Sequence, residues 1–295
     1  MKKVLFTGAG IAIITPFDEN NKVDFQKLEQ IIEYQIENGT DALIVCGTTG
    51  EKSTLLHEEH VGVIRHAVAC TAGRIPVIAG TGSNDTEYTV RLSNEAESCG
   101  ADGLLLVTPY YNKTSQEGLI RHYRFITQRV SAPVILYNVP SRTGMTIEPQ
   151  TYLELSKIPN IVGTKEATGD ISHIAATMAL CGDDLAVYSG NDDQITPIMS
   201  LGGKGVISVL SHVAPRVAHD IAASYLDGNV SQSARLQLEW LDVCKALFAD
   251  VNPIPVKEAM NMMGWQVGAC RMPLAPMSSG KREILRKALA AHGLI

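Results

Sequence analysis

The chain has 295 residues, of which 45% are hydrophobic and 19% charged, a composition typical of a globular protein with a sizeable core. Its formal net charge is −6 and it contains no run of Lys and Arg, which argues against a nucleic-acid partner. No stretch approaches the roughly 18 uninterrupted apolar residues of a transmembrane helix, so no membrane contact is expected.

The cysteines and the amino terminus indicate a cytoplasmic protein. Six cysteines are scattered without Cys-x-x-Cys spacing, which favours buried, reduced thiols over a disulfide framework or a zinc site. They are Cys46, Cys70, Cys99, Cys181, Cys244 and Cys270. The apolar start of the chain is interrupted by Gly8, Gly10 and Pro16 and has no small-residue cleavage site, so it predicts a first strand and not a signal peptide.

Eight short β-branched runs, bounded by Gly and Pro, follow one another along the chain. They cover residues 10–17, 42–47, 76–82, 103–109, 133–140, 161–167, 185–190 and 205–212. Helix-patterned segments lie between them, among them 25–37, 57–70, 85–98 and 116–129. Strands that alternate with helices at this spacing predict a parallel sheet, and eight repeats are typical of the α/β class (β/α)8 TIM barrel.

A doubly wound sheet is the alternative fold. It would require a Gly-x-Gly-x-x-Gly turn after the first strand. Here Gly8 and Gly10 precede the apolar run, and Ile13 stands where the third glycine should be. A dinucleotide-binding fold is therefore not expected.

The pattern changes after about Gly228, where helical periodicity replaces the strands. The helical segments are 232–249, 255–263 and 280–292, and Gly293 is a plausible stop for the last of them. An apolar stripe runs along the first segment through Leu236, Trp240, Val243 and Leu247. We therefore predict a catalytic barrel domain over residues 1–228 and a C-terminal helical domain over 229–295.

Lys165 is the principal candidate for catalysis. It lies within the apolar strand segment 161–167, on the same face as Gly163, while Val162, Thr164 and Glu166 share the other face. Gly163 would leave space beside the long side chain. Lysine offers imine formation with a ketone, which requires the neutral amine, and burial in a barrel disfavours the ammonium form. The alternatives are a lysine that reaches out of the strand end or one that pairs with a carboxylate.

Other polar residues stand at predicted strand ends, where a barrel builds its active site. Tyr137 ends the fifth strand and could relay protons, and Arg142 in the following loop could hold a carboxylate. Thr48 and Thr49, between two glycines after the second strand, could also bind a carboxylate. The pair Tyr110–Tyr111 follows the fourth strand.

No motif with metal-ligand spacing stands out. The segment His57-Glu-Glu-His60 is one residue short of the zincin pattern, although a site assembled in space stays open. No metal and no cofactor are predicted. Covalent catalysis by a lysine is the leading chemistry.

These motifs together resemble the dihydrodipicolinate synthase and N-acetylneuraminate lyase superfamily, and within it the synthase branch. The matching segments are 47–51 (GTTGE), 77–82 (VIAGTG), 108–112 (TPYYN), 137–144 (YNVPSRTG), 163–167 (GTKEA), 205–209 (GVISV) and 252–257 (NPIPVK). They occur in the family's order and span essentially the whole chain. Thr164 departs from the more usual apolar residue, but should face away from the barrel centre.

The resemblance implies a lyase of diaminopimelate and lysine biosynthesis that condenses pyruvate with L-aspartate-4-semialdehyde through a Schiff base. It implies Lys165 as the nucleophile and Tyr137, Thr49 and Tyr111 as a proton relay, with Tyr111 reaching in from a neighbouring subunit of a homotetramer built as a dimer of dimers. It further implies contacts of Thr48 and Thr49 with the pyruvate carboxylate and of Arg142 with the semialdehyde carboxylate. Gly190 and Ile207 would contact the adduct through backbone oxygens.

Relatives of this kind can be inhibited by lysine at the dimer interface. The resemblance places that effector pocket at Lys52, Ser53, His57, His60, Asn84, Tyr88 and Tyr110. Lys52 adds a positive charge, and Tyr88 stands where an acidic group is often found. Both changes should weaken binding of a cationic effector, so weak or absent lysine feedback is predicted.

Two other functions stay open. A related class I pyruvate aldolase, of the N-acetylneuraminate or 2-keto-3-deoxy sugar acid type, would keep Lys165 but accept sugar-derived aldehydes. Arg142 in the Pro-Ser-Arg-Thr-Gly turn favours the synthase over this alternative. A non-catalytic barrel that binds pyruvate-like ligands would have no need for the relay residues.

Overall fold

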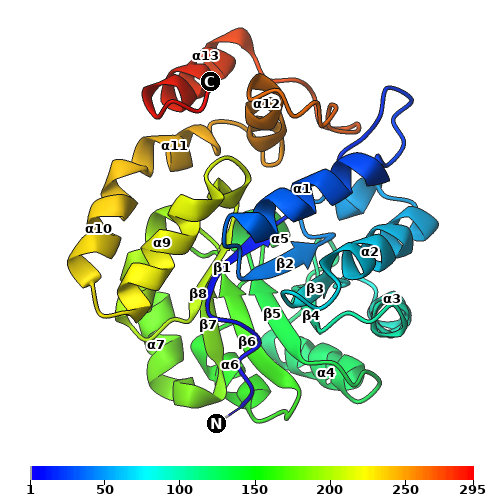
Figure 1. Ribbon diagram of the computed structural model, residues 1–295. Helices are drawn as coiled ribbons and strands as arrows, with labels where there is room; N and C mark the ends of the chain where they lie inside the picture. The colour runs from blue at the N-terminus through cyan, green and yellow to red at the C-terminus, as the bar shows by residue number, and fades with distance from the viewer. Residues whose placement is uncertain (1) are drawn as a thin grey trace.

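Eight parallel strands close into a barrel in chain order in the computed structural model, which describes residues 2–295 (Figure 1). The strands are β1 (Gly8–Ala12), β2 (Ala42–Val45), β3 (Val77–Gly80), β4 (Gly103–Val107), β5 (Val134–Asn138), β6 (Ile161–Glu166), β7 (Ala186–Ser189) and β8 (Gly205–Ser208). β8 pairs with β1 and completes the ring. The predicted (β/α)8 TIM barrel is therefore confirmed.

Helices cover the outside of the barrel and continue beyond it. The α-helices are α1 (Phe25–Glu37), α2 (His57–Thr71), α3 (Thr86–Ser98), α4 (Gln116–Thr127), α5 (Pro140–Thr143), α6 (Pro149–Ser156), α7 (Ile171–Cys181), α8 (Ile195–Ser200), α9 (Pro215–Leu226), α10 (Val230–Glu239), α11 (Leu241–Ala246), α12 (Ile254–Met262) and α13 (Ser279–Ala291). Short 3-10 turns are η1 (Lys52–Thr54), η2 (Gly182–Asp184), η3 (Asp192–Gln194) and η4 (Leu210–His212). Within residues 2–295, no helix combines the length and the apolar character needed to cross a membrane.

Most predicted strands are confirmed but end earlier than expected, and two need correction. β1 covers 8–12 and not 10–17, because the backbone of Phe17 leaves the barrel and donates to Val267 O. The segment expected as the strand 205–212 ends at Ser208. Asp192 accepts hydrogen bonds from the amides of Val209 and Leu210, which turns the chain into η4.

Apolar side chains form one layer inside the barrel and a larger one between strands and helices. The inner cluster includes Ile44, Ile78, Ile135, Tyr188 and Ile207. The outer cluster takes the alternating side chains of the same strands together with the inward faces of the helices. The strands are buried on both faces, which explains why their sequences read as continuous apolar runs.

The seam between β8 and β1 requires glycine. Gly205 has a φ of +147°, and a Cβ at this position would lie 1.9 Å from the carbonyl oxygen of Gly8. Gly8 itself has a φ of +100°. The two glycines pair in register, so the last and first strands can approach closely enough to close the barrel.

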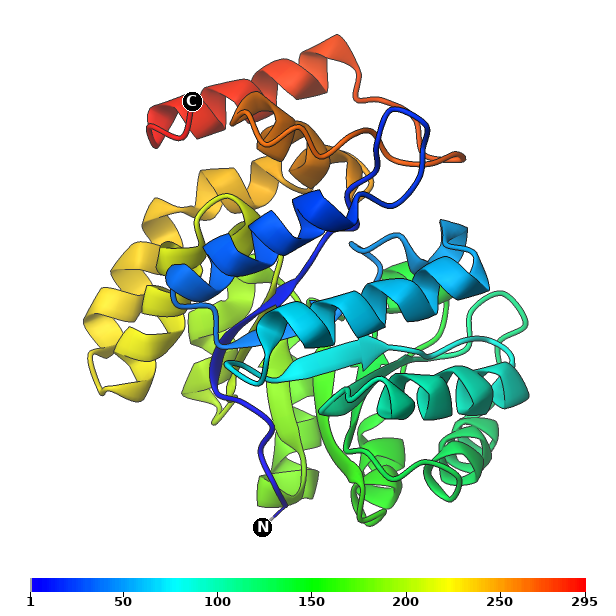
Figure 2. The same ribbon diagram turned by 45° about the vertical axis from the view of Figure 1, so that its right-hand side comes forward.

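The C-terminal helices lie across one end of the barrel, opposite the N-terminus, as the two ribbon views agree (Figures 1 and 2). Lys257 on α12 forms a buried ion pair with Glu51, which follows β2. Arg271 pairs with Glu59 on α2. The C-terminal segment is therefore joined to the carboxyl ends of the strands, where the active site is expected. The division into domains 1–228 and 229–295 stays a prediction.

The helical segment predicted over 232–249 is in fact two helices. α10 ends and α11 begins at Trp240, whose φ and ψ of −99° and 11° interrupt the helix. α10 packs on α9, whereas α11 packs on α13 and η3. The Trp240 ring lies against His292 with the ring centroids 4.2 Å apart, which holds the chain at this bend.

The predicted end of the last helix at Gly293 is confirmed. α13 ends at Ala291, and Gly293 has a φ of +66°, a conformation that favours glycine after a helix.

Candidate active site

Lys165 lies on the inner face of the barrel and only 6% of its surface is exposed. It is in register with Tyr137 on β5 and Tyr188 on β7, and its Nζ lies 4.6 Å from the centre of the Tyr137 ring. Within residues 2–295, no carboxylate is at ion-pair distance from its amine. The buried position excludes a lysine that reaches into solvent, and the missing partner excludes a structural ion pair.

The strand that carries Lys165 contains an irregularity that was not predicted. The register between β5 and β6 shifts at Val134 and Ile135, where Ile161 and Gly163 are paired and Val162 is skipped. Val162 consequently packs with the inner cluster, so its predicted place on the outer face is wrong. Thr164 is on the outer face as expected, where its hydroxyl lies 2.9 Å from Tyr152 Oη.

Gly163 does not leave an empty space for Lys165. A Cβ on Gly163 would lie 2.7 Å from the carbonyl oxygen of Ala186 and 3.4 Å from the Tyr188 ring. The Tyr188 hydroxyl donates to Phe6 O at 2.7 Å, and the Phe6 ring stacks on it at 4.4 Å. Glycine is therefore needed for the close approach of β7, and Phe6 fixes Tyr188, the residue in register with Lys165.

A cleft of about 290 Å³ opens at the carboxyl ends of the strands. Its lining comes from five parts of the chain: the turn after β2, the end of β4 with its loop, the loop after β5, the two residues before α12 and residues 273–274. The predicted site residues on its wall are Thr48, Lys52, Ser53, Tyr110 and Arg142. The structure thus brings together residues that are far apart in the sequence.

Asn252 connects two of the predicted substrate-binding residues. Its side-chain nitrogen donates to the Thr49 hydroxyl at 2.9 Å, and its backbone oxygen accepts from Arg142 at 3.0 Å. Asn252 is 6% exposed, and its side-chain oxygen has no hydrogen-bond partner within residues 2–295. Asn252 was not among the predicted site residues, although it begins the matching segment 252–257.

Tyr111 does not reach the cleft of its own chain. Its side chain is 92% exposed, and its backbone has a φ of +68°, an uncommon conformation for a bulky residue. The neighbouring Tyr110 lines the cleft. The loop after β4 therefore points one tyrosine towards its own site and the other away from it.

Gly190 and Ile207 lie at the ends of β7 and β8. Gly190 donates to Glu166 O at 2.6 Å, and a Cβ there would lie 2.8 Å from the Ala167 side chain. Ile207 is fully buried in the inner cluster. Gly190 is therefore in contact with the end of β6, the strand that carries Lys165, whereas Ile207 lies on the inner face of β8, two strands away.

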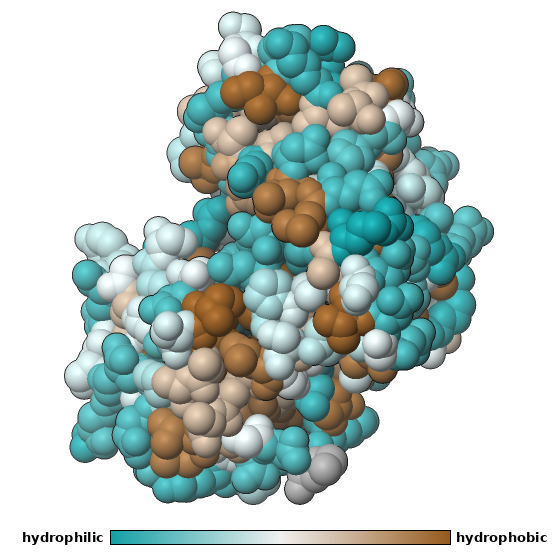
Figure 3. All heavy atoms as spheres, turned by 90° about the vertical axis from the view of Figure 1, so that its left-hand side faces the viewer, coloured by the Kyte–Doolittle hydropathy of each residue, from teal (hydrophilic) through white to brown (hydrophobic). Residues whose placement is uncertain are grey.

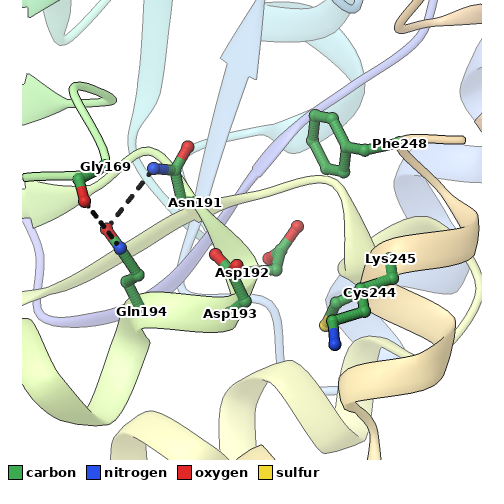
Figure 4. Close-up of a pocket in the computed structure, with 8 residues that line it drawn as sticks. All are labelled: Gly169, Asn191, Asp192, Asp193, Gln194, Cys244, Lys245 and Phe248. Atoms are coloured by element: carbon green, nitrogen blue, oxygen red, sulfur yellow. Dashed lines mark hydrogen bonds between the residues drawn. The ribbon is translucent and has the colours of Figure 1, made fainter. Parts of the chain in front are cut away.

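A second cavity of about 420 Å³ adjoins the end of β7 (Figure 4). Gln194 bridges its rim by donating to Gly169 O at 3.1 Å. Asp192 is 2% exposed, and burial raises the pKa of its carboxyl, against the opposing effect of its hydrogen bonds and of the charge on Lys165. Asp192 was not among the predicted site residues, and it caps the turn after β8 through the amides of Val209 and Leu210.

The residues of the predicted effector pocket fall into two groups: Lys52, Ser53 and Tyr110 line the cleft, whereas His57, His60, Asn84 and Tyr88 do not. His57 lies 3.3 Å from the Tyr88 hydroxyl and 2.9 Å from Glu95, a carboxylate that was not predicted to belong to this pocket.

The other polar residues of the pocket bond to backbone oxygens or backbone atoms nearby. The Lys52 amine donates to Gly82 O, and burial lowers the pKa of this amine to about 8. Burial lowers the pKa of His60 to about 4, although the hydrogen bond of its ring with Gly80 O opposes this shift. Asn84 accepts from Asn112 through its backbone oxygen.

Comparison with known proteins agrees with this geometry. The profile of the Dihydrodipicolinate synthetase family matches residues 5–292. The 4-hydroxy-tetrahydrodipicolinate synthase of Caldicellulosiruptor saccharolyticus is 55% identical over 290 residues, 98% of each chain.

Two solved structures extend the similarity to the fold. A chloride-inhibited dihydrodipicolinate synthase from Acinetobacter baumannii in complex with pyruvate is 43% identical, with a TM-score of 0.96 over 98% of this chain and 99% of that one. A structure described as the first monomeric dihydrodipicolinate synthase variant is 44% identical, with a TM-score of 0.96 over 99% of this chain and 98% of the other. The chain belongs to the dihydrodipicolinate synthetase family.

Proposed function

We propose that this chain is a 4-hydroxy-tetrahydrodipicolinate synthase, which condenses pyruvate with L-aspartate-4-semialdehyde. The observation that carries the proposal is Lys165, buried on the inner face of the barrel beside Tyr137 and without a carboxylate partner among residues 2–295. Family membership and the full-length relative at 55% identity support the same activity. The reaction commits carbon to diaminopimelate and lysine.

In the proposed mechanism, the neutral amine of Lys165 attacks the ketone carbon of pyruvate. Loss of water gives an imine, and loss of a methyl proton converts the imine to an enamine. The enamine carbon then forms the new carbon–carbon bond with the aldehyde carbon of the semialdehyde. The amino group of that substrate next attacks the imine carbon, which closes the ring and releases Lys165. No resident cofactor takes part in these steps.

Proton transfers in these steps are assigned to Tyr137, Thr49 and Tyr111 of the partner subunit. Asn252 supports this role of Thr49, because it donates to the threonine oxygen and leaves the hydroxyl proton available for transfer. We assign the carboxylate of pyruvate to Thr48 and Thr49, and the adduct to the backbone oxygens of Gly190 and Ile207.

Arg142 is the proposed partner of the semialdehyde carboxylate. Its guanidinium carries five N–H donors, and only one hydrogen bond, to Asn252 O, is present among residues 2–295. Enough donors are left for a bidentate contact with a carboxylate at the rim of the cleft. A sugar-derived aldehyde offers no carboxylate at this place, which is why the synthase is favoured over a sugar-acid aldolase.

We further propose a homo-oligomer, a tetramer made of two dimers. The exposed Tyr111 supports an interface at the loop after β4, since it would complete the site of a second copy. Exposed apolar side chains also lie on α7, α9 and α10, among them Leu180, Leu226 and Leu238. Figure 3 shows apolar patches on this side of the molecule. We also propose that the protein is located in the cytoplasm, together with its place in this biosynthetic pathway.

The first experiment supplies purified protein with pyruvate and L-aspartate-4-semialdehyde and follows NADPH oxidation by the next enzyme of the pathway. Turnover that disappears in Lys165→Ala is expected. Borohydride reduction in the presence of pyruvate should then add one pyruvyl group to Lys165 and none to the variant. Covalent capture that persists in Lys165→Ala would place the nucleophile elsewhere. Capture without turnover of the semialdehyde would favour a sugar-acid aldolase.

A further inference from the structure

Three potential metal ligands meet on the outer surface of the barrel, apart from the cleft. They are Glu29 on α1 and His66 and Cys70 on α2, and their ligand atoms all lie within 4.8 Å of one another. His66 and Cys70 are one helical turn apart, so their side chains point to the same side of α2. α1 and α2 pack against each other, which brings Glu29 to this pair (Figure 2).

The spacing of these atoms suits a tetrahedral metal ion. Cys70 Sγ lies 3.3 Å from His66 Nε2. Zinc binds thiolate sulfur at about 2.3 Å and imidazole nitrogen at about 2.0–2.1 Å, so the two ligand atoms of a tetrahedral site are roughly 3.5 Å apart. A shift of a few tenths of an ångström would therefore place both atoms at ligand distance from one ion.

The imidazole of His66 is already oriented. The ring of Phe25 contacts it edge-on, with the ring centroids 5.1 Å apart, and Phe25 also lies opposite Gly62 on α2. Nε2, the nitrogen that would bind a metal, points to Cys70. Little side-chain ordering is left for binding, which favours a preformed site.

The charges around Cys70 favour a dication. Glu33 is held by both guanidinium nitrogens of Arg74, whereas Glu29 has no hydrogen bond or ion pair within residues 2–295. The same carboxylates attract a divalent cation, and a bound ion would displace the thiol proton.

We propose that Glu29, His66 and Cys70 form a binding site for Zn²⁺, with one carboxylate oxygen, one imidazole nitrogen and one thiolate as ligands and water at the fourth position. This mixed donor set suits a borderline-soft ion and not Mg²⁺ or Ca²⁺, which prefer oxygen alone. None of the three residues lines the cleft. The site is therefore independent of the proposed catalytic activity.

The test uses the full-length protein, freed of metal with a chelator and titrated with Co²⁺ as a spectroscopic probe for Zn²⁺. One ion per chain should bind with a thiolate-to-cobalt charge-transfer band, and added Zn²⁺ should abolish the band. Cys70→Ser should remove the band. His66→Gln and Glu29→Gln should weaken binding at least tenfold, since even the loss of a residue that only supports a ligand costs about tenfold.

Cys99→Ser is the matched control, because Cys99 is a partly exposed thiol at the end of α3 outside this cluster. It should leave the titration unchanged. Zn²⁺ should also raise the melting temperature of the parent protein but not of Cys70→Ser, and tighter binding at higher pH should reflect the released proton. A charge-transfer band that survives in Cys70→Ser, or cobalt binding without such a band, would overturn the proposal whatever the catalytic assay shows.

Discussion

The side-chain amide of Asn252 donates a hydrogen bond of 2.9 Å to the hydroxyl of Thr49, although 203 residues separate the two. Thr49 follows the second strand of the barrel, and Asn252 lies two residues before α12 in the C-terminal segment. The contact joins the C-terminal segment to the proposed proton relay. If Thr49 transfers protons as proposed, the segment takes a direct part in orienting its hydroxyl.

Replacing Asn252 by Ala should lower kcat about five- to tenfold with a smaller change in KM, because a net hydrogen bond contributes about 1 kcal/mol to the orientation of Thr49. Steady-state kinetics with both substrates would measure the effect. Asn261→Ala is the control, since Asn261 also bonds the backbone of the C-terminal segment, at Val267 and Gly268. A loss of equal size in both variants would show that Asn252 acts only through stability.

The buried ion pair of Glu51 and Lys257 should be sensitive to the loss of one partner. Their side chains are 1% and 2% exposed, and Lys257 also lies 4.0 Å above the Phe17 ring. Glu51→Gln should destabilise the protein by about 3–5 kcal/mol, because it leaves a buried ammonium without its counter-charge. Denaturant unfolding would measure the change.

The double variant Glu51→Gln/Lys257→Met should recover part of that loss, since neither residue then carries a buried charge. Glu117→Gln serves as the comparison, because the Glu117–Arg121 pair is exposed and should contribute nothing measurable. Equal losses in the single and double variants would contradict the role given to the unpaired charge.

His212 should make the fold sensitive to acid. Its Nε2 accepts from the Ile14 amide at 3.0 Å while Nδ1 lies 2.8 Å from Val209 O, so the ring must be neutral. Burial lowers its pKa to about 4. Between that value and the ordinary 6.5, the unfolded chain binds the proton and the folded chain does not. Stability contributed by this group is therefore lost as pH falls through this window.

His212→Gln keeps an acceptor for Ile14 but has no titrating ring. Its free energy of unfolding should depend less on pH between about 6.5 and 4 than that of the parent protein, whatever its stability at neutral pH. Urea unfolding at several pH values would give both slopes. Parallel curves for the two proteins would rule out His212 as the titrating group.

Lysine should inhibit this enzyme weakly or not at all. The amine of Lys52 donates to Gly82 O and adds a positive charge to the predicted effector pocket. Tyr88 supplies no carboxylate beside His57, so Glu95 on the other ring nitrogen is the one acidic partner of that histidine among residues 2–295. The double variant Lys52→Ser/Tyr88→Glu should bind lysine at least tenfold more tightly, because it removes a cation and adds an anion. Inhibition curves with both proteins would test this. Strong inhibition of the parent enzyme by sub-millimolar lysine would contradict the prediction.

Much of the fold could be predicted because its signals are local. Apolar runs bounded by Gly and Pro, alternating with helical periodicity, predicted all eight strands in the right order. The errors are at places where distant contacts decide the backbone. The bend at Trp240 follows from packing on different neighbours, and the turn after Ser208 follows from capping by Asp192. The skipped Val162 reflects the pairing of two strands, which no single strand encodes.

The barrel and the positions of Lys165 and Tyr137 on its strands could be predicted from local patterns, because adjacent parallel strands align their ends and alternate their side chains. The residues from distant segments that join them could be found only in the folded protein. Asn252 meets Thr49, Tyr111 turns away from its own cleft, and Glu29 meets His66 and Cys70 because separately encoded elements pack together. Such contacts depend on the packing of whole helices and loops, and short-range patterns carry no record of that packing.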